Sequence, residues 1–443
     1  MPRKSSQKRT RYLIVGNSAG GIGAVEAIRQ VDADGPITIV SDEPYPAYSR
    51  PEISEYLAGQ TTLERMLFRP PDFYEKNGVE AILGVAATRL DLRKKRLELE
   101  DRRTVAWERL LLATGGRPTA PRIPGAAREG VFTFTTLADA DHIRAALRPA
   151  CLPAGQTGRV VVIGAGLIGL SLSHALVRLG VPVVIVELLD RPLANALDRE
   201  AAGVVERALR GAGVELVFGQ TVAQVLGRPE DDRCVGGVRL DDGRQLPCDI
   251  LAIAIGVTPR TELAAEASLH VSRGIVVDRH METNHPDVYA CGDAAEAFDF
   301  VHGVERVTPI WPNAYIGGRV AGLNMAGRET AYSGGTGMNA LSYFGLAIVS
   351  AGLQEPGDGP GYEVLTSSDG DATYRKVVLR NGRVAGLTFV GDIERSGIVF
   401  GLMRDGTNVS AFKEALVAPD FGLSMLPEEW RRERLAPLVT EAA

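Results

Sequence analysis

Short apolar runs, each followed directly by a cluster of glycines, are the main pattern along the first two thirds of the chain. Tyr12–Val15 predicts a buried strand, and a helix is expected over Ile22–Ile28. Further on, Arg159–Ile163 is a second β-branched strand, and a helix is expected over Leu170–Leu176. Strand, glycine turn and helix in this order predict α/β units built on parallel sheets.

The first glycine turn has the context of a dinucleotide site. It contains Gly16, Ser18, Ala19, Gly20 and Gly21, between the strand and the helix. In that position, backbone N–H groups and the positive helix end would face a pyrophosphate. Gly16 permits a tight turn and Gly21 permits close packing of helix on strand. Ser18 replaces the middle glycine of G-x-G-x-x-G, a mild departure because serine is small, and an ordinary strand–helix turn is the alternative.

Two acidic residues follow the next expected strand, Ile37–Val40. An acidic side chain at this strand end can accept hydrogen bonds from an adenosine ribose. Asp42 and Glu43 are both candidates, and the register of the strand favours Asp42. The alternative is a pair of solvated loop charges.

The second glycine turn is a complete G-x-G-x-x-G fingerprint. Gly164, Gly166 and Gly169 are its glycines, and Leu167 and Ile168 lie between the last two. Its first glycine follows that of the first turn by roughly 150 residues, about one domain length. Two such units in one chain predict that two dinucleotides bind.

The strand expected at 181–186 ends at Glu187. An acid at this position can bind both hydroxyls of an adenosine ribose and would repel a 2′-phosphate, which favours NADH over NADPH. Arg191 is close by in the sequence and leaves room for NADPH.

Three further strands run into glycine turns, and their order along the chain is informative. They are Leu110–Leu112 before Ala113-Thr114-Gly115, Ile250–Ile255 before Gly256, and Asp287–Ala290 before Gly292-Asp293. In this order the motifs resemble the FAD-dependent pyridine nucleotide oxidoreductase family over nearly the whole chain. The resemblance implies that the Ala113-Thr114-Gly115 turn closes the FAD domain, and that Gly292 and Asp293 lie beside the ribityl chain and the flavin pyrophosphate.

The segment 45–54 narrows the resemblance to rubredoxin reductases, ferredoxin reductases and the flavin part of NADH nitrite reductases. It implies that Arg50 and Pro51 lie along the FAD pyrophosphate and the flavin edge, where arginine offers a forked, charged donor. A surface arginine is the alternative. Trp311, before an expected helix through Gly322, is a candidate neighbour of the isoalloxazine, and core packing explains it nearly as well.

The implied fold class is α/β, with two Rossmann-like dinucleotide-binding domains and an α+β C-terminal interface domain. We expect a disordered basic tail at 1–10, an FAD-binding domain at 11–125 and 253–328, an NAD-binding domain at 126–252, and the interface domain at 329–443. In the last segment, strands are expected over 342–350 and 374–379, a hairpin turn at Asn381-Gly382, and a helix from Gly391 through Met403. This segment resembles FAD subunits found beside carbon monoxide dehydrogenase, phenylglyoxylate dehydrogenase and tungsten aldehyde oxidoreductase.

Composition excludes several other classes. The 443 residues carry a net charge of −6, which argues against a general nucleic-acid binder. The four cysteines include no C-x-x-C pair and the six histidines are scattered, so no metal or iron–sulfur site and no disulfide framework is expected. No apolar stretch approaches the length of a membrane helix, and we expect a cytoplasmic protein.

Hydride transfer between two cofactors needs no nucleophile or acid–base pair, so we assign no catalytic side chain. The first cysteine is Cys151, which argues against a disulfide reductase with a cysteine pair near the flavin. Relatives with a single redox cysteine, such as NADH oxidases and coenzyme A disulfide reductases, carry it near the position of Ser49, and that loop has none. Ferredoxin-reductase relatives often have a lysine where Glu55 stands and a glutamate where Ser171 stands. Their ion pair cannot form in this chain.

The leading hypothesis is therefore an FAD-dependent NADH:acceptor oxidoreductase, which exchanges electrons with an iron–sulfur electron carrier or a subunit of a redox complex. One alternative is an NADH oxidase that uses oxygen. A second is a flavin-stabilised interaction protein whose association depends on its redox state. Flavin monooxygenases fit the motifs less well, and a homodimer is suggested by family analogy alone.

Overall fold

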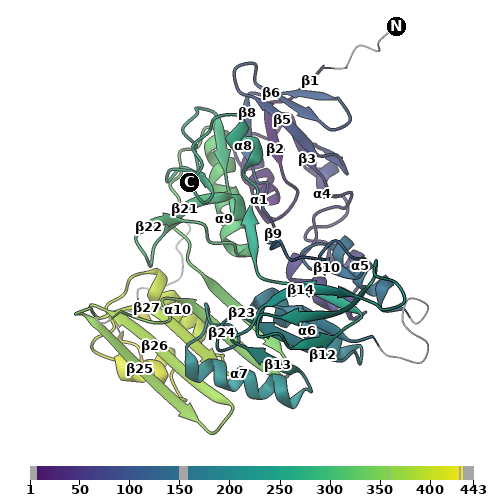
Figure 1. The fold of residues 1–443 in the computed structure, drawn as a ribbon. Helices are drawn as coiled ribbons and strands as arrows, with labels where there is room; N and C mark the ends of the chain where they lie inside the picture. The colour runs from purple at the N-terminus through teal and green to yellow at the C-terminus, as the bar shows by residue number, and fades with distance from the viewer. Residues whose placement is uncertain (1–6, 149–157, 358, 429–430, 433–443) are drawn as a thin grey trace. The chain divides into compact units, whose positions relative to one another are not determined.

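The computed structural model describes residues 7–148, 158–357, 359–428 and 431–432. Contacts divide the chain into two compact units (Figure 1). Unit 1 comprises Met1–Leu188 and Gly213–Gly337, and unit 2 comprises Leu189–Ala212 and Met338–Ala443. This division concerns contacts only, so the domain boundaries expected from the sequence remain predictions.

Unit 1 contains two five-stranded sheets in which all neighbouring strands are parallel. The first has the order β20 (Val288–Ala290), β8 (Arg109–Leu112), β2 (Tyr12–Val15), β3 (Ile37–Ser41), β4 (Val79–Leu83). The second has the order β10 (Val131–Thr133), β17 (Ile250–Ile253), β11 (Val160–Ile163), β12 (Val183–Glu187), β13 (Glu215–Phe218). All residues of β2, β11 and β17 are buried, and so are the last three residues of β8. This is expected of strands that are covered on both faces of a sheet.

A helix follows the glycine turn of each sheet. They are α1 (Ala19–Arg29) after β2 and α6 (Leu167–Arg178) after β11. Helix α1 lies against α9 (Trp311–Met325), and glycines form the contact. A Cβ added to Gly318 would lie 2.0 Å from the carbonyl oxygen of Gly20, so the two helix backbones touch directly. A residue larger than glycine therefore does not fit at Gly318, where the two helices cross.

Unit 1 also contains smaller separate sheets and several short helices. The short sheets are β1 (Gln7–Arg9), β7 (Thr104–Ala106), β6 (Arg96–Leu99), β5 (Ala87–Asp91); β14 (Val222–Gly227), β15 (Val235–Leu240), β16 (Gln245–Pro247); β18 (Val257–Pro259), β9 (Gly116–Pro118); and β19 (Ile275–Val276), β21 (Ala295–Asp299), β22 (Val304–Arg306). The short helices are η1 (Arg50–Glu52), α2 (Ile53–Leu57), α3 (Leu63–Met66), α4 (Phe73–Lys76), α5 (Leu137–Ala146), α8 (Glu262–Glu266) and η3 (Gly292–Ala294).

Two expectations for this unit are corrected. Gln7–Arg9 pair in parallel with Thr104–Ala106, so the end of the segment expected as a disordered tail belongs to a sheet, while residues 1–6 lie outside the described residues. The strand expected at 181–186 begins at Val183. Proline has no N–H for the ladder, and Pro182 contributes only its carbonyl oxygen, to the N–H of Val160 at 3.0 Å.

Unit 2 is built on a five-stranded antiparallel sheet, visible in yellow-green in Figure 1. Its order is β23 (Met338–Tyr343), β24 (Leu346–Gly352), β27 (Arg383–Val390), β26 (Thr373–Arg380), β25 (Tyr362–Asp369). The helical elements of the unit are α7 (Arg199–Gly211), α10 (Ser396–Arg404), η4 (Lys413–Val417) and η5 (Leu423–Met425). Helix α7 contacts β26 and β27, although in the chain it is the crossover between β12 and β13.

The hairpin expected at Asn381-Gly382 is confirmed, with φ of +52° and +71° at the two turn residues. The single strand expected over 342–350 is wrong. Phe344 and Gly345 adopt φ of +54° and +75° and join β23 to β24 as a second hairpin. A phenylalanine rarely adopts this backbone conformation, so no turn was expected there. The helix expected from Gly391 begins at Ser396, and Gly391 itself has φ +83°.

A buried ion pair holds α7 in unit 2. Asp198 caps the helix by accepting the N–H of Ala201 at 2.9 Å. Its other carboxylate oxygen accepts Lys376 Nζ at 2.7 Å and the Tyr374 hydroxyl at 2.8 Å. Burial alone would raise the pKa of Asp198, but the hydrogen bonds from Lys376, Ala201 and Tyr374 together lower it.

Replacing Lys376 with methionine should therefore destabilise the protein by about 3–5 kcal/mol, because it leaves a buried carboxylate without its cation. Urea denaturation measures the loss, and Lys413→Met, which removes a more exposed ion pair with Glu363, should cost much less. The contribution of Asp198 should be complete at neutral pH and disappear as the pH falls through its lowered folded pKa. Equal losses in the two variants would contradict this account.

Candidate functional site

Backbone atoms pack closely against the glycines of the first turn. Gly16 has φ +122°, and a Cβ there would lie 2.0 Å from the carbonyl oxygen of Ala113. A Cβ on Gly21 would lie 2.1 Å from the carbonyl oxygen of Gly16. Both distances are far below a van der Waals contact, so only glycine fits at either position. The turn therefore brings the start of α1 directly against the Ala113-Thr114-Gly115 segment.

Ser18 stands at the N-cap position of α1 with an extended backbone, φ −131° and ψ −159°, and its side chain makes no capping hydrogen bond. Any L-residue adopts these angles, which explains why serine can replace the middle glycine of the fingerprint. Ala19 and Gly20 are buried in the first turn of α1, and a Cβ on Gly20 would lie 2.7 Å from Cys291 Sγ. The N-terminus of α1 is thus fixed between two neighbouring strand ends.

The second glycine turn repeats this geometry. Gly164 has φ +102°, and a Cβ there would lie 2.6 Å from the carbonyl oxygen of Ala254. A Cβ on Gly169 would lie 1.9 Å from the carbonyl oxygen of Gly164. The N–H groups of Gly16 and Gly164 even donate to equivalent strand residues, Val40 and Val186, at 2.8 Å each. The two turns therefore have the same backbone geometry.

Gly166 caps α6, which begins with Leu167 and Ile168, and it differs from its neighbours in having room around it. A Cβ on Gly166 would have no other heavy atom of the described chain within 4 Å. Glu187, at the end of β12, accepts the N–H of Ala165 in the same turn at 2.6 Å. The predicted ribose acid therefore lies against the predicted pyrophosphate turn.

The glycine turns after β8 and β17 lie side by side. The Thr114 hydroxyl donates to the carbonyl oxygen of Arg260 at 2.7 Å, and the Thr119 N–H donates to that of Gly256 at 2.9 Å. Gly115 and Gly256 have φ of +69° and +108°, and a Cβ on either would meet nothing in the described chain within 4 Å. Backbone is therefore accessible at both turns.

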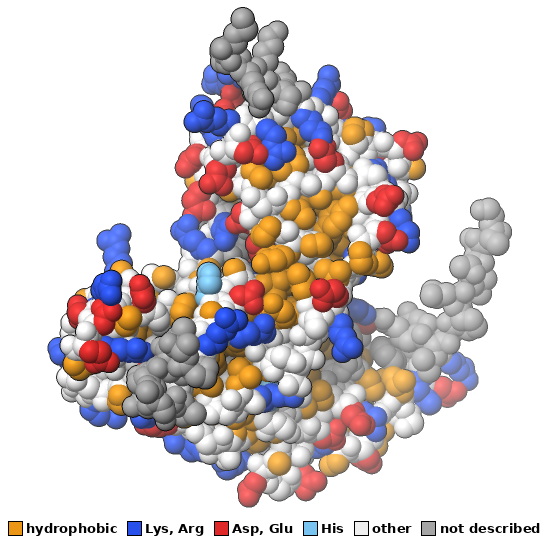
Figure 2. Space-filling view, turned by 90° about the vertical axis from the view of Figure 1, so that its right-hand side faces the viewer, with side chains coloured by type: hydrophobic (Ala, Val, Ile, Leu, Met, Phe, Trp, Pro, Cys, Tyr) orange, Lys and Arg blue, Asp and Glu red, His pale blue; other side chains and the backbone are white. Residues whose placement is uncertain are grey.

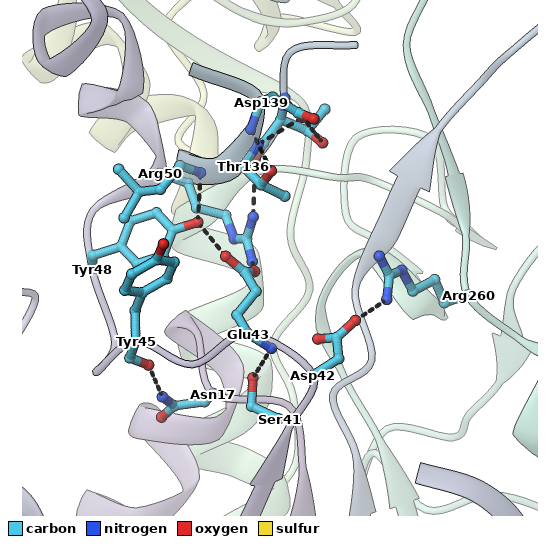
Figure 3. A network of polar contacts seen from close by, with 12 residues as sticks. Asn17, Ser41, Asp42, Glu43, Tyr45, Tyr48, Arg50, Thr136, Asp139 and Arg260 are labelled. Carbon is cyan, nitrogen blue, oxygen red and sulfur yellow. Dashed lines mark hydrogen bonds and ion pairs between the residues drawn. The ribbon is translucent and has the colours of Figure 1, made fainter. Parts of the chain in front are cut away.

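A polar network ties the loop after β3 to the start of α5 (Figure 3). Glu43 accepts the Tyr48 hydroxyl at 2.6 Å and forms an ion pair with Arg50. Arg50 also donates to the carbonyl oxygen of Thr135 at 2.9 Å, and the Tyr48 hydroxyl accepts the Leu137 N–H at 3.3 Å. Pro51 follows Arg50 within the 3-10 helix η1. Glu43 is thus turned away from its neighbour Asp42.

Asp42 forms an ion pair with Arg260, at 2.7 Å, on the exposed side of the same loop. The two acids considered for the ribose therefore have separate partners in the structure. Tyr48, Thr135 and Arg260 were missed by the sequence analysis. Of these three, only Arg260 could have been suggested by the sequence, because it lies shortly after the Gly256 turn. Tyr48 and Thr135 belong to no recognised motif.

Asp293 is a half-buried acid for which the described residues supply no hydrogen bond. It follows Gly292, which has φ +71°, and among the described residues no hydrogen bond reaches its carboxylate. Burial raises the pKa of Asp293, and the positive charge of Arg50 opposes this rise. A ligand hydroxyl would supply the hydrogen bond that Asp293 lacks.

Trp311, half-buried at the start of α9, packs edge-on against Phe68 with ring centroids 5.0 Å apart.

Further features of the described residues concern metal ligands, thiols and membrane spans. No group of three or more His, Cys, Asp or Glu there could hold a metal ion. Cys234, Cys248 and Cys291 are free thiols, and Cys151 lies outside the described residues. Burial raises the pKa of the Cys291 thiol to about 12, so it stays protonated at neutral pH. No described helix combines the length and apolarity of a membrane span.

Both glycine turns therefore fit a dinucleotide. Each offers a helix N-terminus, glycines that only a tight turn explains, and an accessible backbone turn on the neighbouring strand. Glu187 accepts a hydrogen bond from the second turn, and the charge of Arg50 acts on Asp293.

Comparison with known proteins agrees with this geometry. The model of the pyridine nucleotide-disulphide oxidoreductase family matches residues 10–318, and that of the rubredoxin NAD+ reductase C-terminal domain matches residues 338–407. The chain is 31% identical to the NADH-dependent phenylglyoxylate dehydrogenase subunit epsilon of Aromatoleum evansii over 96% of its own length and 99% of that protein.

Two further similar proteins are matched over different shares of their own length. The chain is 30% identical to nitrite reductase [NAD(P)H] of Bacillus subtilis over 91% of its length, but it spans only 48% of that protein. The structure of the ferredoxin reductase for the CYP199A2 system of Rhodopseudomonas palustris superposes with a TM-score of 0.83 at 26% identity, over 94% of this chain and 99% of the other.

These matches confirm the fold class, the resemblance to rubredoxin and ferredoxin reductases, and an NAD(P)H oxidoreductase with FAD and NAD(H) as its cofactors. The family match covers the two glycine turns, the Gly292-Asp293 turn and most of α9. The chain belongs to the pyridine nucleotide-disulphide oxidoreductase family.

Proposed function

We propose that this chain is an NADH:acceptor oxidoreductase that exchanges electrons with an iron–sulfur protein. The observation that carries the proposal is the duplicated glycine turn, each copy joined to its own parallel sheet and its own acidic residues. FAD, when bound, supplies the chemistry: it accepts two electrons as hydride and can release them singly.

The first turn would hold FAD. N–H groups at the start of α1, from the Gly16–Gly21 turn, would donate to the pyrophosphate, and Asp42 would accept from the adenosine ribose. Asp293 would accept from a ribityl hydroxyl, and Arg50, with Pro51, would line the pyrophosphate and the flavin edge. Glu43 would hold Arg50 and Tyr48 in place. Gly115, Gly292 and Trp311 would lie beside the cofactor.

The second turn would hold NAD(H). The N–H groups of Gly166, Leu167 and Ile168 at the start of α6 would donate to its pyrophosphate, and Glu187 would accept from both ribose hydroxyls. Gly256 would permit close approach of the backbone near the nicotinamide end. The chain's own contribution to hydride transfer is then to stack the two cofactors and exclude water.

An iron–sulfur partner is supported by the similarity to a ferredoxin reductase and to a rubredoxin reductase C-terminal domain. Hydrophobic side chains gather in the upper part of the face shown in Figure 2, between mixed acidic and basic side chains. Apolar areas of this kind are typical of protein-binding surfaces. A cytoplasmic location and the domain boundaries 11–125 with 253–328, 126–252 and 329–443 are part of this proposal.

Anaerobic mixing with NADH should bleach the flavin absorbance at ~450 nm rapidly, and mixing with NADPH should bleach it much more slowly. The reason is that the Glu187 carboxylate repels a 2′-phosphate. Stopped-flow absorbance measures both rates. Absence of bound flavin, or no bleaching by either nucleotide, would refute the proposed function.

The reduced protein should then be reoxidised faster by a ferredoxin or a rubredoxin than by dissolved oxygen. Stopped-flow mixing of the reduced protein with each acceptor compares these rates. Faster reoxidation by oxygen would favour an NADH oxidase. Slow reoxidation by all of them would favour an interaction protein whose association depends on its redox state.

A further inference from the structure

Arg260 lies beside the first glycine turn, although in the chain it follows β17 of the second parallel sheet and then β18. Its N–H donates to the carbonyl oxygen of Gly115 at 2.9 Å, and its own carbonyl oxygen accepts the Thr114 hydroxyl at 2.7 Å. The preceding strand, β18, pairs with β9, which directly follows Gly115. The backbone of Arg260 is therefore held on both sides by the segment that packs against Gly16.

The side chain of Arg260 reaches the strand end on the other side of the same turn (Figure 3). Its Nη1 donates to Asp42 Oδ2 at 2.7 Å. Asp42 follows Val40 by two residues, and the carbonyl oxygen of Val40 accepts the Gly16 N–H at 2.8 Å. Contacts within unit 1 therefore connect the arginine, the acid and the first glycine turn.

The pair of Arg260 and Asp42 leaves acceptor capacity for a ligand. Among the described residues, Asp42 is the only acceptor that the Arg260 guanidinium reaches, and the buried Nε of Arg260 has no hydrogen-bond partner. Asp42 Oδ1 accepts no hydrogen bond from the described residues either. Because both oxygens of a carboxylate accept hydrogen bonds, Oδ1 can bind a ligand hydroxyl while Oδ2 stays with Arg260.

This ion pair is poorly suited to stabilising the fold. The side chains of Arg260 and Asp42 are 38% and 48% exposed, and solvent screens ion pairs of this kind so that they contribute little to stability. Orienting an exposed carboxylate before a ligand arrives does, however, reduce the conformational entropy that binding costs. We propose that Arg260 is a positioning residue for FAD, because it holds the Asp42 carboxylate in place for the adenosine ribose. This inference rests on the proposed function.

The test is FAD binding to the Arg260→Met variant of the full-length protein from which flavin has been removed. With Asp42 no longer held, the Kd of FAD from fluorescence titration should rise about tenfold, as expected when a charge-assisted hydrogen bond is weakened. The Tm of the apoprotein should change by no more than about 2 °C, because the ion pair is exposed. Arg260→Lys should bind FAD within about threefold of the parent, since lysine keeps the charge and a donor for Asp42.

An FAD analogue whose adenosine ribose lacks both hydroxyls separates positioning of Asp42 from a general effect on the site. The analogue offers Asp42 no ribose hydroxyl, so the parent and Arg260→Met should bind it with Kd values within about twofold of each other. Arg117→Met is the matched control, because it removes an exposed ion pair with Glu262 from β9, the strand that pairs with β18. Its Kd for FAD should equal that of the parent.

Three results would overturn the proposal: an unchanged Kd for FAD in Arg260→Met, an equal loss of affinity for FAD and for the analogue, or an equal loss in Arg117→Met. Failure of the proposed function is distinguishable, because the parent protein would then bind no FAD or would not be reduced by NADH.

Discussion

Alanine in place of Gly16 is expected to give a protein that is purified without flavin. The new Cβ would lie 2.0 Å from the carbonyl oxygen of Ala113, and the backbone would have to keep φ +122°. Neither conflict can be relieved by a side-chain movement, because the colliding atom is backbone of the neighbouring strand end. The turn that we propose to present N–H groups to the FAD pyrophosphate must therefore change shape.

The ratio of flavin to protein absorbance after purification measures this effect. Gly59→Ala is the matched control, since Gly59 also has positive φ, +70°, but a Cβ there has no described heavy atom within 4 Å. It tests the backbone strain without the collision, and the variant should retain its flavin. If the Gly16→Ala protein carried the same flavin content as the parent, the first turn could not be the FAD site.

Asparagine in place of Asp293 is expected to weaken FAD binding and to stabilise the protein without FAD. Asp293 is half-buried, desolvation raises the pKa of its carboxyl group, and no described residue gives it a hydrogen bond. Removing this partly desolvated charge should relieve a desolvation cost. Once FAD binds, the same carboxylate would accept a ribityl hydroxyl, a charge-assisted hydrogen bond of roughly 1.5–3 kcal/mol, so the variant's Kd should rise about ten- to one-hundredfold.

Two measurements are needed, the Tm of the apoprotein and the Kd of FAD from fluorescence titration. Because burial raises the pKa of Asp293, the stability advantage of asparagine should grow as the pH rises through that raised pKa and vanish at lower pH. Asp42→Asn is the control: its carboxylate is exposed and paired with Arg260, so the apoprotein should gain no stability. A less stable Asp293→Asn apoprotein would contradict the assignment.

Local sequence signals predicted the parts of the site that depend on neighbouring residues. Each glycine turn, its strand and its helix lie within about 20 residues, and the strand-end acid follows at the next strand. The second turn was complete as a motif. The substitution at Ser18 was tolerable, as the sequence suggested, because its backbone is extended rather than left-handed.

Contacts between distant residues could not be predicted in this way. The sequence left Asp42 and Glu43 as alternatives, and only the fold shows that Glu43 turns to Tyr48 and Arg50. The ion pair between Arg191 and Glu355 joins positions 164 residues apart. The hairpin at Phe344 was hidden because its turn uses a phenylalanine where asparagine or aspartate is usual.

The pairing of α7 with the C-terminal sheet has a consequence for synthesis of the chain on the ribosome. Asp198 precedes its partner Lys376 by 178 residues. At 5–20 residues per second, the helix would wait about 10–35 s before β26 has been made. During that interval its apolar side would lack its final cover, whereas the sheet around β2 needs only Ala290 to be complete. In the nascent chain, the five strands of the sheet around β2 would therefore be complete before α7 can pack against β26 and β27.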